Sequence, residues 1–190
     1  VFILEVMGRH AGWIAAASAL AARNETDPPH IILMPEVPFA KKKFIDKVKQ
    51  TVANEGFCVV VASEGTRYKN GMFLADSGLT DAFGHKQLGG VAPVLAQMIS
   101  SIGLKNHWAV SDYLQRSARH ISSKTDLDQA YAVGKKAVEF ALAGKNAVMP
   151  VIKRLSDKPY KWKIESASLS KVANVEKTLP KAFISKDGFG

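Results

Sequence analysis

A glycine-punctuated segment with an arginine offers the clearest chemistry in this chain. Met7, Gly8 and Arg9 follow an apolar run, residues 1–6, and a helix is expected to begin near Gly12. At such a strand-to-helix turn, unpaired backbone N–H groups and a guanidinium converge at the edge of a sheet, a combination that suits a phosphate group. The spacing alone does not specify a site, because strand–glycine–helix junctions occur throughout α/β proteins.

The composition favours anionic partners without choosing among them. The chain has 190 residues, 26 Lys and Arg against 17 Asp and Glu, and a formal net charge of +9. Phosphorylated metabolites, nucleic acid and acidic membrane surfaces all attract such a charge. Much of the excess comes from scattered lysines, for example those in 41–43 and 177–186, which we interpret as solvated surface. No nucleic-acid-binding motif occurs, and we predict no nucleic acid partner.

The hydrophobic pattern predicts a layered α/β fold. Short β-branched apolar runs alternate with longer segments of helical period, which is typical of a mainly parallel sheet flanked by helices. The expected strands are residues 1–6, 31–34, 57–62, 107–110 and 147–152, and the expected helices lie near 11–23, 41–54, 87–102 and 126–143.

Two of the expected helices have well-defined apolar faces. At 126–143, Thr125 and Asp128 resemble a capping box, and Gly144 supplies the stop. At 41–54, Gly56 closes the helix. The face of the first is Leu127, Ala130, Tyr131, Val138, Ala141 and Leu142, and that of the second is Phe44, Ile45, Val48 and Val52.

The chain is expected to form one large domain with an extension. We predict an α/β domain over residues 1–152 and a C-terminal extension, 153–190, packed on it. The extension contains a charged, hairpin-like stretch at 160–164 and a short helix at 169–172. Because the sequence opens inside an apolar strand without a methionine, we interpret it as a fragment of a longer protein.

The single cysteine and the lack of long apolar stretches suggest a reducing, cytoplasmic compartment. Cys58 lies within the apolar run 57–61, which predicts a small buried hydrophobe rather than a nucleophile or metal ligand. The apolar stretches are too short to span a bilayer, and no secretory leader is recognisable. We therefore expect no membrane partner.

Four motifs, in order along the chain, resemble the phosphofructokinase family. Residues 7–9, Met-Gly-Arg, followed by Gly-Trp, resemble its sugar-phosphate-binding motif, and residues 64–65 resemble its Glu-Gly pair. Residues 81–90 resemble the lead into its next helix, and residues 113–116, Tyr-Leu-Gln-Arg, are similar to its second phosphate-binding motif. The resemblance covers nearly the whole chain, most firmly residues 1–152, and implies a phosphofructokinase-like fold.

The resemblance implies that residues 1–152 bind fructose 6-phosphate. Met7 and Gly8 would present an apolar edge and backbone to the sugar ring, where glycine permits close approach. Glu64 would accept hydrogen bonds from the sugar hydroxyls and so orient the substrate. The alternative for Glu64 is an ordinary turn or helix-capping residue.

The same resemblance assigns phosphate groups to the remaining motif residues. Arg9 would face the phosphoryl group in transfer and stabilise charge in the transition state. Tyr113 would donate a hydrogen bond to the 6-phosphate, and Arg116 would clamp it through its guanidinium. Alternatively, the arginines are surface residues and Tyr113 packs beside Trp108.

The implied reaction transfers a phosphoryl group from pyrophosphate to the 1-hydroxyl of fructose 6-phosphate, giving fructose 1,6-bisphosphate. The family's catalytic aspartate, in a Thr-Ile-Asp-Asn-Asp segment, and its glycine-rich donor loop have no counterpart in this sequence. No residue here is therefore assigned as the base or as a metal ligand. Mg²⁺ would be held with the donor, mostly by residues outside this chain, and binding without catalysis is expected of the chain alone.

The phosphoryl donor and the subunit arrangement have alternatives. Tyr113 replaces the histidine of many ATP-dependent members and, with residues 81–90, looks more like the pyrophosphate-using group; an ATP-dependent 6-phosphofructokinase is the alternative. We expect a homo-oligomer, although His107 stands where many bacterial members have an arginine that reaches across subunits. An alternative of another class is a non-catalytic basic module that binds a phospho-metabolite or nucleic acid.

Overall fold

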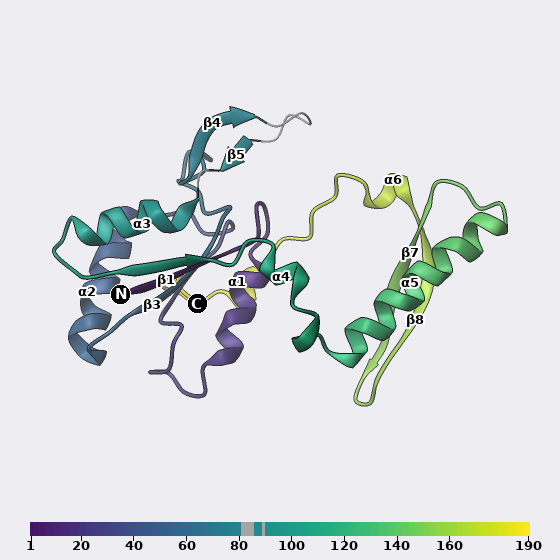
Figure 1. Ribbon diagram of the computed structural model, residues 1–190, viewed down its shortest axis with the longest axis horizontal. Helices are drawn as coiled ribbons and strands as arrows, with labels where there is room; N and C mark the ends of the chain where they lie inside the picture. Colours follow the sequence, from purple (N-terminus) through teal and green to yellow (C-terminus); the bar gives the residue numbers. More distant parts are fainter. Residues whose placement is uncertain (81–85, 89) are drawn as a thin grey trace. The chain divides into compact units, whose positions relative to one another are not determined.

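The computed structural model describes residues 1–80, 86–88 and 90–190 (Figure 1). The described chain divides into two compact units: the first contains residues 1–115 with 176–190, and the second contains residues 116–175. The boundary that we expected after Ile152 lies inside a strand. Among the described residues, no helix has the length and apolar character needed to cross a membrane.

A parallel sheet forms the centre of the first unit. Its strand order is β2-β3-β1-β6, and every neighbouring pair is parallel. The strands β1, β2 and β3 are largely buried, as parallel sheets require, whereas β6 lies at the edge of the sheet and is largely exposed. The predicted α/β fold with a mainly parallel sheet is confirmed for this unit. The strands are β1 (Phe2–Val6), β2 (Ile31–Leu33), β3 (Val59–Ser63) and β6 (His107–Val110).

Helices cover both faces of this sheet. α2 (Lys41–Glu55) and α3 (Val91–Ser100) pack against one face, and α1 (Trp13–Ala17) packs against the other (Figure 1). The strand residues divide accordingly, because successive side chains point to opposite faces. Ile31 and Leu33 join the cluster under α2 and α3, whereas Ile32 and Met34 join the cluster under α1.

Of the four residues predicted for the apolar face of α2, two are buried and two, Ile45 and Val52, are half-buried. Phe44 and Val48 are fully buried, and Gly56 ends the helix with a φ of 79°. Cys58 lies in the same cluster, as predicted. Burial raises the pKa of its thiol to about 11, so this cysteine is an inert hydrophobe.

Two expected helices are shorter than predicted. The segment 11–23 contains α1 and the 3₁₀ turn η1 (Ser18–Ala21), after which the backbone is extended at Ala22. The segment 87–102 becomes helical at Val91, because Gly90 has a φ of 98° and cannot continue a right-handed helix. Before it, β4 (Asp76–Thr80) pairs antiparallel with β5 (Lys86–Leu88).

The second unit combines a long helix with an antiparallel hairpin. α5 (Lys124–Leu142) packs on β7 (Val148–Asp157) and β8 (Tyr160–Ser168). The expected strand 147–152 is observed within β7, which forms a two-stranded antiparallel sheet with β8 and is not part of the parallel sheet. The remaining short elements are α4 (Leu114–Ser117), η2 (Arg119–Ile121) and α6 (Leu169–Val172), the last as predicted.

The start and the packing of α5 differ from the sequence prediction. Ser123, rather than Thr125, caps the helix by accepting a hydrogen bond of 3.0 Å from the Asp126 N–H. Gln129 and Phe140 are its buried residues. The predicted apolar face is exposed: Leu127, Tyr131, Val138 and Leu142 are 49%, 76%, 60% and 84% exposed.

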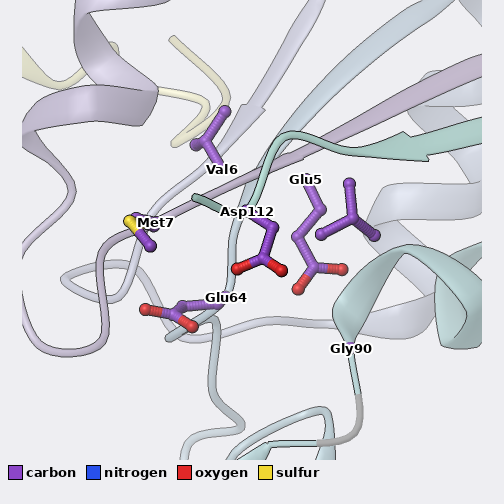
Figure 2. Close-up of a pocket in the computed structure, with 7 residues that line it drawn as sticks. Glu5, Val6, Met7, Glu64, Gly90 and Asp112 are labelled. Atoms are coloured by element: carbon purple, nitrogen blue, oxygen red, sulfur yellow. The ribbon is translucent and has the colours of Figure 1, made fainter. Parts of the chain in front are cut away.

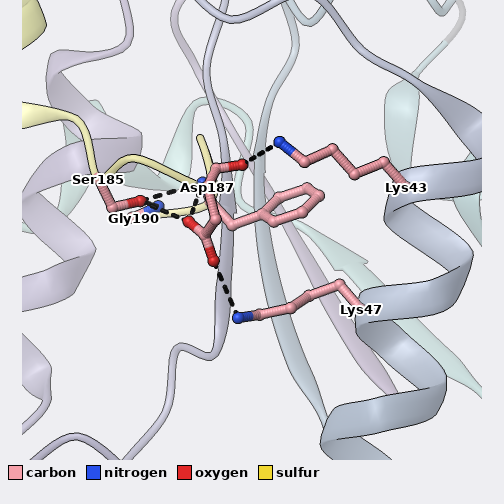
Figure 3. Close-up of polar contacts among 6 residues, drawn as sticks. Lys43, Lys47, Ser185, Asp187 and Gly190 are labelled. Atoms are coloured by element: carbon pink, nitrogen blue, oxygen red, sulfur yellow. Dashed lines mark hydrogen bonds and ion pairs between the residues drawn. The ribbon is translucent and has the colours of Figure 1, made fainter.

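Residues 176–190, here called the return segment, lie on the first unit. The N–H of Ile32 donates to the carbonyl of Phe189 over 2.7 Å. Figure 3 shows the carboxylate of Asp187 beside Lys47 of α2, at an Nζ–Oδ2 distance of 2.9 Å, while Lys43 contacts its carbonyl. Burial raises the pKa of Asp187, but hydrogen bonds from Ser185 and Lys47 outweigh that effect and hold it at about 2. The segment includes η3 (Lys181–Phe183).

Candidate functional site

The carboxyl ends of β1, β3 and β6 meet at one edge of the parallel sheet. Val6 pairs with Ser63, and Glu5 pairs with Val110. The loops that begin after these strands therefore emerge side by side. In open α/β sheets, ligands bind outside this edge.

A cavity of about 270 Å³ lies at that edge. In Figure 2 the side chains of Glu5 in β1, Glu64 after β3 and Asp112 after β6 lie close together around this cavity. Met7 and Glu64 were predicted from the sequence as site residues, and both line the cavity. The full lining is Glu5, Val6, Met7, Glu64, Gly90, Val110 and Asp112.

Backbone contacts hold Gly8 and Arg9 directly on the end of β3. The N–H of Gly8 donates to Glu64 Oε1 over 3.2 Å, and the N–H of Gly65 donates to the Gly8 carbonyl over 3.2 Å. The hydroxyl of Ser63 donates to the same carbonyl. A Cβ at position 65 would lie 1.9 Å from the carbonyl oxygen of Arg9. Only glycine permits this approach, which explains the Glu-Gly pair physically.

The backbone of Arg9 is anchored while its side chain is available. Arg67 donates from Nη2 to the Arg9 carbonyl over 3.2 Å, and its guanidinium stacks 4.9 Å from the centre of the Phe73 ring. Among the described residues, the guanidinium of Arg9 has no hydrogen-bond or ion-pair partner. A fixed backbone with an unengaged guanidinium suits a residue that binds an anionic group.

Glu5 is a site residue that the sequence prediction missed. It is 5% exposed, and its Oε2 accepts a hydrogen bond of 2.8 Å from the Ala92 N–H at the start of α3. Burial raises the pKa of Glu5 above its ordinary 4.5, and repulsion by Glu64 and Asp112 adds to that rise, although the N–H groups of α3 lower it. The sequence could have indicated this residue, because Glu5 is a charged residue within the apolar run 2–6.

Asp112 was also missed. It follows the end of β6 and has a φ of 41°, a left-handed conformation that is unfavourable for a residue with a side chain. Its carbonyl accepts a hydrogen bond of 3.2 Å from the side chain of Gln115. An acidic residue two positions after a strand was the signal. Gly90 belongs to the motif 81–90, whereas Val110 gave no signal of its own.

The second predicted phosphate motif lies at the junction of the two units. Tyr113 follows Asp112 in the first unit, is 65% exposed and does not line the cavity. Arg116 is the first residue of the second unit. Their joint binding of a 6-phosphate stays a prediction. The motif residues 81–85 and 89 lie outside the described part of the chain.

The cavity can accept hydrogen bonds but is unsuited to a phosphate or a metal. Glu5, Glu64 and Asp112 offer acceptor oxygens to hydroxyl groups, and their negative charge repels phosphate. No described group of three or more His, Cys, Asp or Glu side chains could hold a metal ion. A polyhydroxylated ligand fits this lining.

Known proteins with similar sequences are phosphotransferases. The phosphofructokinase family profile matches residues 1–141. The chain is 63% identical to a pyrophosphate–fructose 6-phosphate 1-phosphotransferase of Halomonas elongata and 59% identical to one of Xanthomonas campestris. Each match covers 100% of this chain and 46% of the relative, so the chain spans about half the length of these proteins.

A solved structure agrees with these matches. The crystal structure of a pyrophosphate-dependent phosphofructokinase from Marinobacter aquaeolei superimposes with a TM-score of 0.82 at 56% identity. The superposition covers 100% of this chain and 44% of the other. The similarity therefore extends over both described units.

Proposed function

The chain belongs to the phosphofructokinase family, and we propose that it supplies the fructose 6-phosphate site of a pyrophosphate-dependent phosphotransferase. In the complete protein, the 1-hydroxyl of fructose 6-phosphate attacks a phosphorus atom of pyrophosphate, giving fructose 1,6-bisphosphate and phosphate. The parallel register of β1, β3 and β6 carries this proposal, because it places the Met7–Arg9 loop, Glu64 and Asp112 at one sheet edge.

The cavity is the proposed binding place of the sugar hydroxyls. Glu64 accepts hydrogen bonds from them, and Glu5 and Asp112 add further acceptor oxygens. Met7 packs against the ring, and Gly8 permits close approach of its backbone. Because these carboxylates repel phosphate, they favour an orientation in which the hydroxyls face inward.

The arginines are the proposed partners of the phosphates. Arg9 stabilises charge on the phosphoryl group in transfer, for which its available guanidinium is suited. Tyr113 and Arg116 bind the 6-phosphate through a phenol and a bidentate guanidinium. A homo-oligomer and a cytoplasmic location also belong to the proposal.

In this proposal the donor and its Mg²⁺ are held mostly by residues outside this chain. Bound with the donor, Mg²⁺ would neutralise phosphate charge. The described residues here bind and orient the acceptor.

The donor is tested by assaying the complete polypeptide that contains this chain with pyrophosphate and with ATP. The names of the relatives at 63% and 59% identity favour pyrophosphate. We expect turnover with pyrophosphate and none with ATP. The opposite result would identify the ATP-dependent enzyme and contradict the proposal, whereas this chain without the remainder should bind fructose 6-phosphate but not turn it over.

Two substitutions test the residue roles in the complete polypeptide. Arg116→Ala should raise the KM for fructose 6-phosphate about 10- to 150-fold, since it removes a charged hydrogen bond of about 1.5–3 kcal/mol. Arg9→Ala should mainly lower kcat. The matched controls are Arg154→Ala and Arg23→Ala, which remove exposed arginines paired with Asp157 and Asp27. Unchanged kinetics in both test variants would show that the site lies elsewhere.

A further inference from the structure

Glu36 connects the Arg9 loop to the return segment. It follows β2 by a short turn, and its carboxylate accepts hydrogen bonds from two distant parts of the chain. Oε1 accepts from the N–H of Gly12 over 3.0 Å and from the N–H of Leu179 over 2.8 Å. Oε2 accepts from the N–H of Gly12 over 3.1 Å. One side chain thereby joins the start of α1 to a segment more than 140 residues away in sequence.

Further contacts beside Glu36 hold the same two segments together. The indole Nε1 of Trp13 donates to the carbonyl of Lys177 over 2.7 Å, and His10 Nδ1 contacts Glu176 Oε1. Leu179 is 4% exposed and packs in the core cluster beneath α1. Residues 10–13 are therefore fixed by the return segment and by Glu36.

Arg9 lies between two anchored stretches. On one side, Gly8 and the carbonyl of Arg9 are held by the end of β3 and by Arg67. On the other side, Gly12 is held by Glu36. A Cβ at Gly12 would lie 2.9 Å from Glu36 Oε2, so the two residues are in close contact. The loop has little freedom at either end, which limits where the guanidinium can reach.

We propose that Glu36, acting with the return segment, is a positioning residue for Arg9. This inference rests on the proposed function, in which Arg9 stabilises the charge of phosphoryl transfer. Such stabilisation depends on a guanidinium that is already in place when the charge develops. Glu36 does not line the cavity, so its effect passes through the loop and not through a contact with the sugar.

Both oxygens of Glu36 take part in this connection. Oε1 accepts from the N–H groups of Gly12 and Leu179, and Oε2 accepts from the N–H of Gly12 alone. Glutamine has the same length but replaces one acceptor oxygen by an amino group, which would face the N–H of Gly12. Glu36→Gln therefore removes part of the connection while it preserves the size of the side chain.

The first test is kinetic and uses the complete polypeptide with pyrophosphate. Glu36→Gln should lower kcat by about 10- to 100-fold, the range expected when a catalytic group is displaced by about an ångström. The KM for fructose 6-phosphate should change by less than about threefold, because Glu64 and Arg116 are untouched. Glu25→Gln, an exposed acid in the loop before β2, is the matched control and should keep wild-type values.

The second test is a double-mutant cycle with Arg9→Ala. If Glu36 acts through Arg9, Glu36→Gln should change kcat less than about twofold in the Arg9→Ala background. Effects that multiply would show that Glu36 acts independently and would overturn the inference. If Arg9→Ala alone keeps full turnover, the role of Arg9 in the proposed function is wrong and the inference fails with it. If Arg9→Ala is impaired but Glu36→Gln is not, only the inference fails.

A milder variant covers the case in which Glu36→Gln does not fold. Trp13→Phe keeps an aromatic ring and removes the hydrogen bond to Lys177. It should lower kcat by about two- to fivefold, with little change in KM, since one neutral hydrogen bond contributes about 1 kcal/mol. Unchanged kcat in a folded Trp13→Phe protein would contradict positioning by the return segment.

Discussion

α2 in the first unit and α5 in the second have similar apolar patterns in sequence but are packed differently. In α2 the predicted residues Phe44 and Val48 are fully buried against the parallel sheet. In α5 the predicted residues Tyr131 and Val138 are 76% and 60% exposed, and Phe140 is buried instead. Periodicity identifies an apolar face, but a helix with apolar residues on both sides can be packed on either.

The two units differ also in how they use glycine and polar side chains. In the first unit, Gly65 and Glu36 hold segments that are distant in sequence. In the second, local contacts dominate, such as the cap by Ser123 and the pairing of β7 with β8. Substitutions in the first unit should therefore affect function and long-range order, whereas those in the second unit, apart from Arg116, should affect local stability.

The largest contrast is expected between two glycine-to-alanine substitutions. Gly65→Ala places a Cβ 1.9 Å from the Arg9 carbonyl, so the loop must move and fructose 6-phosphate binding should be lost. Gly134→Ala adds a Cβ where nothing lies within 4 Å, and should stabilise α5 by up to about 1 kcal/mol. Calorimetric titration and thermal unfolding measure the two effects. Binding retained by Gly65→Ala would show that the close approach is not needed.

The next largest contrast is expected between the truncation of an apolar residue in α2 and one in α5. Phe44→Ala should lower the free energy of unfolding by about 3–5 kcal/mol, because it empties a fully buried site. Val138→Ala, on the exposed face of α5, should change it by less than about 0.5 kcal/mol. Urea unfolding followed by tryptophan fluorescence reports the units separately when it is measured in a Trp162→Phe background for the first unit and in a Trp13→Phe/Trp108→Phe background for the second. An equal loss of unfolding free energy in Phe44→Ala and Val138→Ala would mean that Val138 is buried and not exposed.

A smaller effect is expected at the start of α5. Ser123→Ala removes the acceptor for the Asp126 N–H and should destabilise the second unit by about 1 kcal/mol. Thr125→Ala is the control, because the structure assigns the cap to Ser123, and its effect should stay below about 0.5 kcal/mol. The same urea experiment measures both. A larger effect of Thr125→Ala would restore the capping box predicted from sequence.

The smallest effect is a dependence on pH in the return segment. The pKa of Asp187 lies at about 2 in the folded protein, below its ordinary 3.8. Its contribution to stability is therefore complete above the ordinary value and is lost as the pH falls toward about 2. Asp187→Asn should reduce the loss of stability that the first unit shows as the pH falls. The acid unfolding of the second unit, followed by Trp162, should stay unchanged. An identical acid profile in both proteins would refute the contribution of Asp187.

Much of the fold was predictable because it depends on short-range patterns. The apolar runs identified β1, β2, β3 and β6. Gly56 and Gly144 were predicted as helix ends because glycine readily adopts a positive φ, and both have one in the structure. The partner of β7 was not predictable, since one strand pattern is compatible with several neighbours. The first residue of α5 was also not predictable, because serine and threonine are both favoured as helix caps and the sequence could not choose between Ser123 and Thr125.

Sequence by itself determined which residue types stand after each strand: Met7 to Arg9 after β1, Glu64 and Gly65 after β3, and Asp112 and Tyr113 after β6. The tertiary structure alone decided that Glu5 faces the cavity while it caps α3, and that Glu36 receives the N–H of Leu179. The physical reason is distance along the chain. Local preferences depend on near neighbours, whereas these carboxylates find their hydrogen-bond donors only after sheet, helices and return segment have packed.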